Sequence, residues 1–162
     1  MNKKDTVVFD LDGTLLDTLE DLKNSVNYAM TQCGYPEHTL DEVRRYVGNG
    51  ILLLMQRAIP GGKDDPNFDK AFTLFKEHYG KHCNDTTKPY AGIMELLHTL
   101  KENNIKIAIV SNKADFAVKE LNAIYFKDLI LVAIGEKESE GIRKKPAPDT
   151  VIEALKQLGS TA

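Results

Sequence analysis

Hydrophobic positions along the chain change their spacing twice, which divides the sequence into three stretches. An apolar run rich in β-branched residues predicts a strand over residues 6–10. Over residues 18–85 the apolar residues recur every three or four positions, which predicts helices and no strand. Over residues 86–162 the pattern alternates, because almost wholly apolar runs at 105–110 and 129–134 lie between stretches of helical spacing.

Punctuation residues predict where the helices of the middle stretch begin and end. Gly34 follows the first helical pattern and supplies a stop. Thr39 and Glu42 have the spacing of a capping box, which predicts that a helix begins there. Two glycines, Gly48 and Gly50, then separate this helix from the next, "ILLLMQRAI".

The order of these elements predicts the fold class. Alternating strands and helices favour right-handed βαβ units and a parallel sheet, and apolar strands are typical of a sheet covered on both faces. The helical stretch interrupts this pattern after the first strand. We therefore predict an α/β protein with a partial Rossmann-like parallel-sheet core, residues 1–17 and 86–162, and an inserted α-helical domain, residues 18–85.

The composition is that of an ordinary soluble protein. Of its residues, 42% are hydrophobic and 28% are charged. With 162 residues the chain is long enough for one core. The net charge of −3 and the lack of a Lys/Arg-rich block argue against nucleic acid or an anionic membrane as the main partner. No apolar run approaches the ~20 residues of a membrane span, and the N-terminus lacks the apolar region of a signal peptide. We expect a cytoplasmic protein in which Cys33 and Cys83 are free thiols.

Carboxylates gather directly after the first predicted strand, in the stretch "VVFDLDGTLLDT". It contains Asp10, Asp12 and Asp17. Like charges at close quarters repel, so a cation, a proton or the metal of an anionic substrate must compensate them. In an open parallel sheet such groups lie beyond the carboxyl ends of the strands, where ligands bind.

Polar residues also follow the other two predicted strands. Ser111, Asn112 and Lys113 come after the second strand, and Lys144 and Lys145 lie in the loop after the third. Carboxylate and carbonyl oxygens favour Mg2+, whereas Ser, Asn and Lys bind phosphate oxygens. Because these strand ends meet at one edge of the sheet, the combination predicts a phosphate ester held with a hard cation.

Other interpretations of the first motif are weaker. An EF-hand loop needs an acid or Asn where this chain has Thr14, and Gly where it has Leu15. A phosphate-binding loop of the type G-x-x-x-x-G-K-[ST] does not occur. A purely structural interpretation is a polar strand end with an Asx-turn before Gly13.

Three segments resemble motifs of the haloacid dehalogenase superfamily of phosphotransferases. "DLDGTLLDT" resembles its first motif, D-x-D-G-T-[LV], "IVSN" its second, and "KKPAPD" its third, a Lys followed by Pro. The helical insert is similar to the superfamily's α-helical cap. Within the insert, "RRYVGNG" followed by "LLL" is similar to the phosphoglycolate phosphatase branch.

The resemblance implies a role for each residue of these motifs. Asp10 would be the nucleophile that forms an aspartyl phosphate, and Asp12 the general acid and base. Mg2+ would be held by the Asp10 side chain and the Asp12 backbone carbonyl. Ser111 would donate to the transferring phosphoryl group, and Lys145 would neutralise its charge. Backbone N–H groups around Gly13 would add donors.

Further residues are expected to contact the substrate. Asn112 is expected to donate to phosphate oxygens. The turn of Gly48, Asn49 and Gly50 would close over the non-phosphate end of the substrate. A helix C-cap followed by the start of the next helix explains the same turn without a ligand.

No role in binding substrate is assigned to Lys144, Asp17, His78 or His82. Lys145 is preferred to Lys144 because it directly precedes a proline. Asp17 is expected to cap the following helix. His78 and His82 have metal-ligand spacing, but without a third ligand in view we expect a solvated helix face.

The sequence departs from the family pattern near its end. A fourth motif, a strand ending in Gly-Asp with another Asp soon after, would complete the Mg2+ shell. After Lys145 the only Asp is Asp149, which is expected to cap a helix. Without that strand, residues 6–10 would form a sheet edge. Either the chain is part of a longer protein, which we favour, or it is a short form with weak or no catalysis.

These observations predict a Mg2+-dependent phosphatase that acts on a small phosphorylated metabolite resembling phosphoglycolate. One alternative is a sugar phosphomutase with the same covalent intermediate. Another is a non-catalytic protein that binds a partner through its exposed sheet edge. The sequence predicts neither the physiological substrate nor the oligomeric state.

Overall fold

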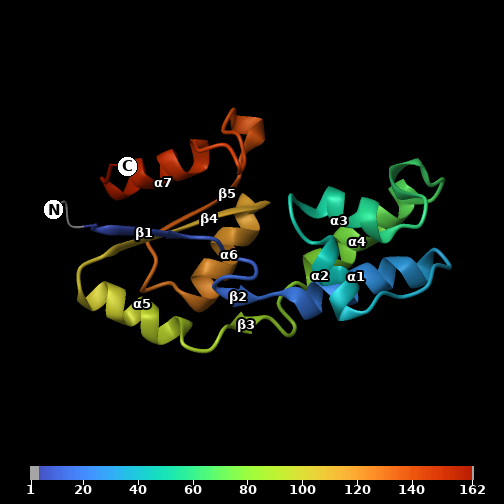
Figure 1. The fold of residues 1–162 in the computed structure, drawn as a ribbon, viewed down its shortest axis with the longest axis horizontal. Coiled ribbons are helices and arrows are strands. Elements are labelled where there is room, and N and C mark those ends of the chain that lie inside the picture. Colours follow the sequence, from blue (N-terminus) through green and yellow to red (C-terminus); the bar gives the residue numbers. More distant parts are fainter. Residues whose placement is uncertain (1–3, 162) are drawn as a thin grey trace. The chain divides into compact units, whose positions relative to one another are not determined.

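The chain folds into two compact units (Figure 1). The computed structural model describes residues 4–161, so residues 1–3 and 162 of the predicted core lie outside the described residues. The core unit contains the chain up to Leu16 and from Pro89 onward, and the helical unit is Asp17–Lys88. The first boundary lies one residue, and the second three residues, from the boundary expected. The two connecting segments pair as a two-stranded sheet, β2 (Leu16–Asp17) with β3 (Lys88–Pro89).

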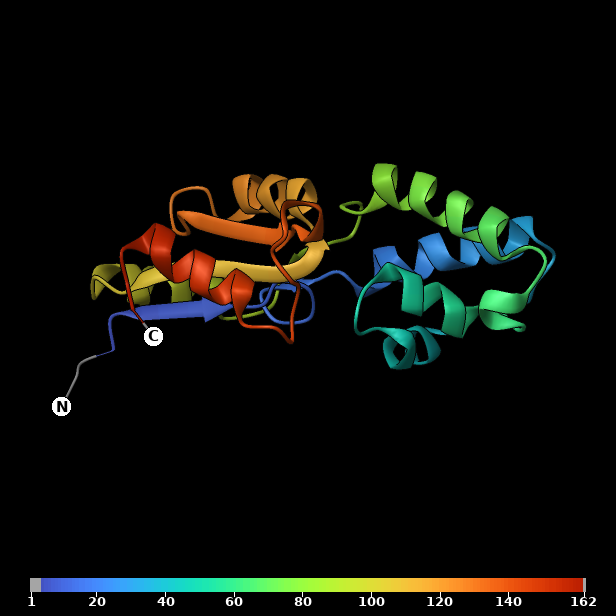
Figure 2. The same ribbon diagram turned by 90° about the horizontal axis from the view of Figure 1, so that it is seen from above.

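A three-stranded parallel sheet forms the centre of the core unit, in the order β1–β4–β5 (Figure 2). Phe9 pairs with Ile109, and Ile109 pairs with Ala133, so the strands run in register side by side. The strands are β1 (Thr6–Phe9), β4 (Lys106–Ala114) and β5 (Val132–Glu136). The helices of this unit are α5 (Ile93–Glu102), α6 (Asp115–Tyr125) and α7 (Asp149–Leu158).

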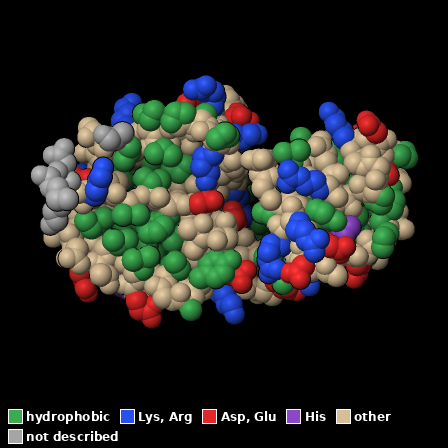
Figure 3. Space-filling model, in the orientation of Figure 1, with side chains coloured by type: hydrophobic (Ala, Val, Ile, Leu, Met, Phe, Trp, Pro, Cys, Tyr) green, Lys and Arg blue, Asp and Glu red, His purple; other side chains and the backbone are tan. Residues whose placement is uncertain are grey.

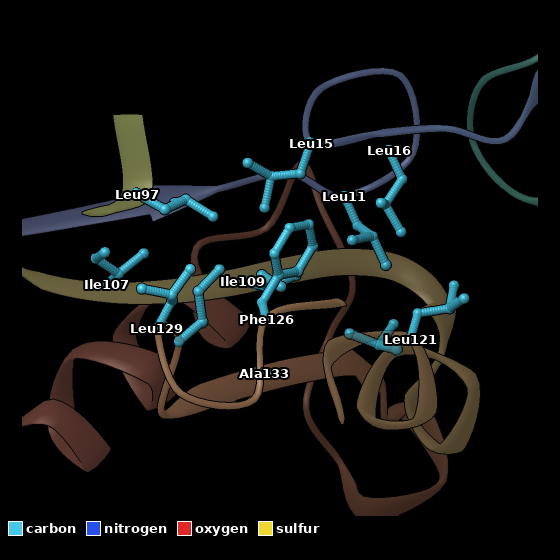
Figure 4. Close-up of a cluster of buried hydrophobic side chains, with 12 residues drawn as sticks. Leu11, Leu15, Leu16, Leu97, Ile107, Ile109, Leu121, Phe126, Leu129 and Ala133 are labelled. Carbon is cyan, nitrogen blue, oxygen red and sulfur yellow. The ribbon is translucent and has the colours of Figure 1, made fainter. Parts of the chain in front are cut away.

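Helices cover both faces of the sheet because successive strand residues point to opposite faces. Ile107 and Ile109 of β4 pack with residues of α5 and α6 in one cluster (Figure 4). Ala108 and Val110 pack against α7 in another. The predicted α/β class is confirmed, and the nearly unbroken apolar pattern of β4 follows from burial on both faces.

Two strands differ from the predicted ranges. β4 continues to Ala114, with a register irregularity against β5 between Val110 and Ala114. β5 begins only at Val132, because the N–H groups of Leu129 and Ile130 donate to the Phe126 carbonyl in the turn after α6, at 2.9 Å each. Leu129 and Ile130 are buried, but from a turn rather than from a strand.

β1 lies at an edge of the sheet. Among the described residues it pairs only with β4, and its four residues are half-buried. Figure 3 shows hydrophobic side chains on both sides of β1, toward α5 and toward α7. The edge position agrees with the expectation for residues 6–10.

Four α-helices form the helical unit: α1 (Leu19–Gln32), α2 (Leu40–Tyr46), α3 (Ile51–Ala58) and α4 (Phe68–His82). The predicted capping box is confirmed, because the Glu42 N–H donates to Thr39 Oγ1 and the Thr39 N–H donates to Glu42 Oε2. Gly34 follows α1 with a φ of 76°, a conformation that favours glycine. Among residues 4–161, no helix is both long and apolar enough to cross a membrane.

A buried carboxylate ties the two ends of the helical unit together. Asp21, in the first turn of α1, is 1% exposed. It accepts five hydrogen bonds of 2.7–3.0 Å from the backbone N–H groups and hydroxyls of Thr86 and Thr87. Burial alone would raise the pKa of Asp21, but these hydrogen bonds outweigh it and hold the pKa below its ordinary value.

We expect Asp21→Asn to destabilise the protein by about 3 kcal/mol, because the amide NH2 cannot accept hydrogen bonds and buried donors lose their partner. Urea unfolding followed by circular dichroism measures the change. Asp41→Asn is the matched control, since the Asp41 side chain is 71% exposed and its ion pair contributes less than about 1 kcal/mol. Equal effects of the two substitutions would contradict the prediction.

Candidate active site

The first motif forms a tight loop directly after β1. The Leu11 N–H donates to Asp10 Oδ1 at 2.8 Å, and the Gly13 N–H donates to the Leu16 carbonyl at 2.9 Å. Gly13 has a φ of 78°, which lets the chain turn back. Leu11, Leu15 and Leu16 are fully buried and anchor the loop in the core (Figure 4). The apolar residues of the motif therefore fix the backbone on which the two acids are displayed.

The second motif lies in the irregular part of β4. Beyond Val110 the strand leaves regular register with β5, and a bulge of this kind re-aims side chains. Ser111 is 3% exposed, and its hydroxyl accepts the Lys113 N–H at 3.1 Å. This hydrogen bond lies in the last part of β4, near the carboxyl end of the sheet.

The third motif reaches the first through Lys145. The Lys145 ammonium lies 2.9 Å from Asp10 Oδ1 and donates to the Val110 carbonyl at 3.0 Å. Lys144 instead faces Glu138, at 3.3 Å. The structure therefore places Lys145, and not Lys144, against the first acid of the motif.

Asn112 holds the third motif in place. Its Oδ1 accepts the Lys145 N–H at 2.9 Å, and its Nδ2 donates to the Lys145 carbonyl at 3.0 Å. The expectation was that Asn112 donates to phosphate. The structure engages the side-chain amide with the main chain of Lys145, and the contact of Asn112 with phosphate stays a prediction.

A second ion pair was missed by the sequence analysis. The Lys113 ammonium donates to Asp12 Oδ1 at 2.9 Å, with the Lys113 side chain 10% exposed and the Asp12 side chain 29% exposed. The signal available in the sequence was a lysine two residues after the serine of the second motif. Asp10 and Asp12 therefore each pair with a lysine, and the two lysines come from different segments.

The predicted residues of the cap lie in the other unit. Gly48, Asn49 and Gly50 connect α2 to α3, with φ values of 128°, 61° and 94°. Arg57 Nη1 donates to the Tyr46 carbonyl at 2.8 Å and lies 3.5 Å from the Gly48 carbonyl. Gly50 is the N-cap residue of α3, so the turn has the structural role that explains it without a ligand, and its contact with substrate stays a prediction.

Asp10 and Asp12 supply the oxygen donors of a candidate Mg2+ site. Among residues 4–161, no group of three His, Cys, Asp or Glu side chains could hold a metal ion. Mg2+ is commonly bound by one or two carboxylates, with water and substrate phosphate completing the shell. The Asp10 carboxylate and the Asp12 backbone carbonyl therefore fit as a partial shell.

Two expectations outside the site need correction. Asp149 does not cap α7: its carboxylate binds the Arg143 guanidinium at 2.8 and 2.9 Å, because Arg143 lies in the preceding loop. His78 departs from the expected solvated face, because its ring stacks on Tyr28 and its Nδ1 is hydrogen-bonded to Ser25 Oγ at 2.9 Å, whereas the His82 side chain is 46% exposed, as expected. Asp17 does bond the first residue of α1, accepting the Leu19 N–H at 3.4 Å.

The histidine pair forms a stack within the helical unit. The rings of His78 and His82 lie 4.3 Å apart, and His82 Nδ1 is 2.7 Å from an oxygen of Asp85. Burial lowers the pKa of His78, and the charge of His82 lowers it further against the opposing effect of Asp85. His78 therefore resists protonation in the folded chain.

Comparison with known proteins assigns the family. Residues 7–162 match the family of haloacid dehalogenase-like hydrolases. Two relatives are the phosphoglycolate phosphatases of Thiobacillus denitrificans, 33% identical over 159 residues, and Aquifex aeolicus, 32% identical over 157 residues. Both alignments cover 94% of this chain, and they cover 69% and 70% of the relatives. The chain therefore belongs to the haloacid dehalogenase-like hydrolases.

Within that family, the phosphoglycolate phosphatases are similar to this chain in structure as well as in sequence. The crystal structure of a proposed phosphoglycolate phosphatase from Lactobacillus delbrueckii is 33% identical, with a TM-score of 0.90. The superposition covers 98% of this chain and 75% of that chain. The named relatives belong to a class of phosphoric monoester hydrolases.

We expect the stability of the protein to fall as the pH drops from about 7 to about 5. The folded pKa of His78 lies below the ordinary 6.5, so the unfolded chain binds the proton more readily. The contribution of His78 to stability is therefore fully present above the ordinary pKa of 6.5, and it is lost as the pH falls toward the pKa of His78 in the folded chain. Urea unfolding midpoints at the two pH values measure this.

His78→Gln should reduce this pH dependence, whereas His98→Gln, at an exposed site on α5, should leave it unchanged. The interpretation is wrong if both variants keep the full dependence of the parent chain.

Proposed function

We propose that the chain is a Mg2+-dependent phosphatase that hydrolyses a small phosphorylated metabolite such as phosphoglycolate through an aspartyl phosphate. The observation that carries the proposal is the 2.9 Å pair of Lys145 with Asp10, with Asp12 two residues further on in the same loop. A phosphate monoester is an anion, so a carboxylate can attack it only where positive charge offsets the repulsion. The family relationship supports the same reaction class.

The contacts of Asp10 support an assignment of the attacking oxygen. Oδ1 accepts the Leu11 N–H and faces Lys145, so Oδ2 is assigned as the nucleophile. Oδ2 forms a bond to phosphorus while the bond from phosphorus to the ester oxygen breaks. Asp12 donates a proton to that oxygen, which leaves as an alcohol.

The second step returns both acids to their starting state. Asp12, now ionised, takes a proton from water as the water oxygen attacks phosphorus. The bond from phosphorus to Asp10 Oδ2 breaks, which releases inorganic phosphate and the Asp10 carboxylate. An acid two residues from the nucleophile can therefore serve both steps.

Lys145 and Ser111 would hold the transferring phosphoryl group. An ammonium has three hydrogens, and two of those on Lys145 are directed at Asp10 and Val110. The third is assigned to a phosphoryl oxygen, together with the Ser111 hydroxyl. The Asp10 side chain and the Asp12 carbonyl would hold Mg2+, which supplies positive charge to the phosphoryl oxygens when bound.

We expect Asp10→Asn to lower the rate of phosphate release from 2-phosphoglycolate by at least about 10³-fold, because the amide is not a nucleophile. A colorimetric phosphate assay measures the rate. Asp5→Asn is the control, because Asp5 is an exposed acid just before β1. An Asp10→Asn chain with the rate of the parent would exclude the covalent mechanism.

Chelation should abolish turnover in the same assay. With EDTA in excess, we expect phosphate release to fall to background, and added Mg2+ to restore it, because two anionic groups then lose their compensating cation. Ca2+ at the same concentration serves as a control for simple charge screening. Turnover that is unchanged in EDTA would show that the reaction does not need the metal.

A further inference from the structure

We propose that Lys113 is a positioning residue that fixes the Asp12 carboxylate for proton exchange with the leaving group. The inference rests on the proposed function, because it gives Asp12 the role of general acid and base. Lys113 lies outside the three segments that resemble motifs of the family. Its link to the reaction is the 2.9 Å contact between its ammonium and Asp12 Oδ1.

The burial of Lys113 argues for more than a surface ion pair. Only 10% of its side chain is exposed, so the side chain is largely withdrawn from water. Withdrawing a charge from water is costly, and the Lys119 ammonium, which pairs with Asp115 on a side chain that is 55% exposed, avoids that cost. The loop that carries Asp12 is already anchored by the buried Leu11 and Leu15. The loop thus has an apolar anchor that does not depend on the pair.

The backbone directs Lys113 toward Asp12. Its N–H donates to Ser111 Oγ at 3.1 Å, so the lysine backbone is fixed by the residue assigned to the phosphoryl group. The register irregularity between Val110 and Ala114 falls on this segment. Within this segment Asn112 bonds Lys145 and Lys113 bonds Asp12, so successive side chains reach the third and the first motif.

The contact distinguishes the two oxygens of Asp12. Lys113 bonds Oδ1, which assigns Oδ2 to the proton that passes to the ester oxygen. A carboxylate held at one oxygen loses rotational freedom about its terminal torsion, which is otherwise broad. Lys113 thus acts on the reaction through the orientation of Asp12. Of the two ion pairs, Lys145 contacts the nucleophile Asp10, and Lys113 contacts the general acid Asp12.

The test compares two substrates that differ in their need for a proton. The leaving group of an alkyl ester such as 2-phosphoglycolate is an alkoxide, which departs poorly without a proton. The leaving group of p-nitrophenyl phosphate is a stable phenolate, which departs without one. We expect Lys113→Met to lower kcat for 2-phosphoglycolate by about 10²-fold, and at least about tenfold more than kcat for p-nitrophenyl phosphate. Lys113→Arg should recover part of the loss, and Lys119→Met, the matched control, should change neither rate.

A double variant separates positioning from a structural role. In a chain that carries Asp12→Asn, the further change Lys113→Met should have little additional effect on 2-phosphoglycolate turnover, because a residue that acts through Asp12 loses its target. Circular dichroism checks that each variant is folded. Should Lys113→Met not fold, the comparison of Lys113→Arg with the parent on the two substrates makes the same test, with a smaller selective loss expected.

The outcomes distinguish this inference from the proposed function. If the parent chain hydrolyses both substrates and a Lys113 variant slows both equally or neither, positioning is excluded while the phosphatase assignment stands. An equal rise in KM for both substrates would make Lys113 a phosphate-binding residue instead. If the parent chain, supplied with Mg2+, hydrolyses neither substrate, both the proposed function and the role of Lys113 are wrong.

Discussion

The parallel pairing of β1 with β4 is the constraint on which the candidate site depends. Because Phe9 lies beside Ile109, the residues that follow each strand emerge at the same edge of the sheet. Asp10 and Asp12 directly follow β1, and Ser111 to Lys113 lie in the last part of β4, although about a hundred residues separate the two segments in sequence. A shift of one residue would move every apolar side chain of the strand to the other face, so the burial of Ile107 and Ile109 also fixes the register of the site.

Much of this arrangement could be predicted from the sequence, because the signals are local. The apolar run before Asp10, the Gly at position 13 and the capping box at Thr39 each specify their own backbone. Lys145 could be chosen over Lys144 from its neighbouring proline. The predicted fold class and family are confirmed, and the roles of the individual site residues stay predictions.

The features that could not be predicted depend on contacts between distant segments. The late start of β5 follows from two N–H groups that bond the Phe126 carbonyl, although Leu129 and Ile130 have the composition of a strand. The pair of Lys113 with Asp12 joins two segments 101 residues apart, where β4 leaves its regular register with β5, and apolar periodicity encodes neither feature. His78 was misjudged for the same reason, since Ser25 and Tyr28, which contact it, lie on a different helix.

The five hydrogen bonds of Asp21 have a consequence for how this architecture tolerates change. They clamp the segment that enters the helical unit to the segment that leaves it, so both ends of the insert lie within reach of one carboxylate. An insert with adjoining ends adds little strain to its host, because the host strands need not spread to accommodate it. We therefore expect that another domain with the same spacing between its two ends could replace the helical unit without a change in the pairing of β1 with β4.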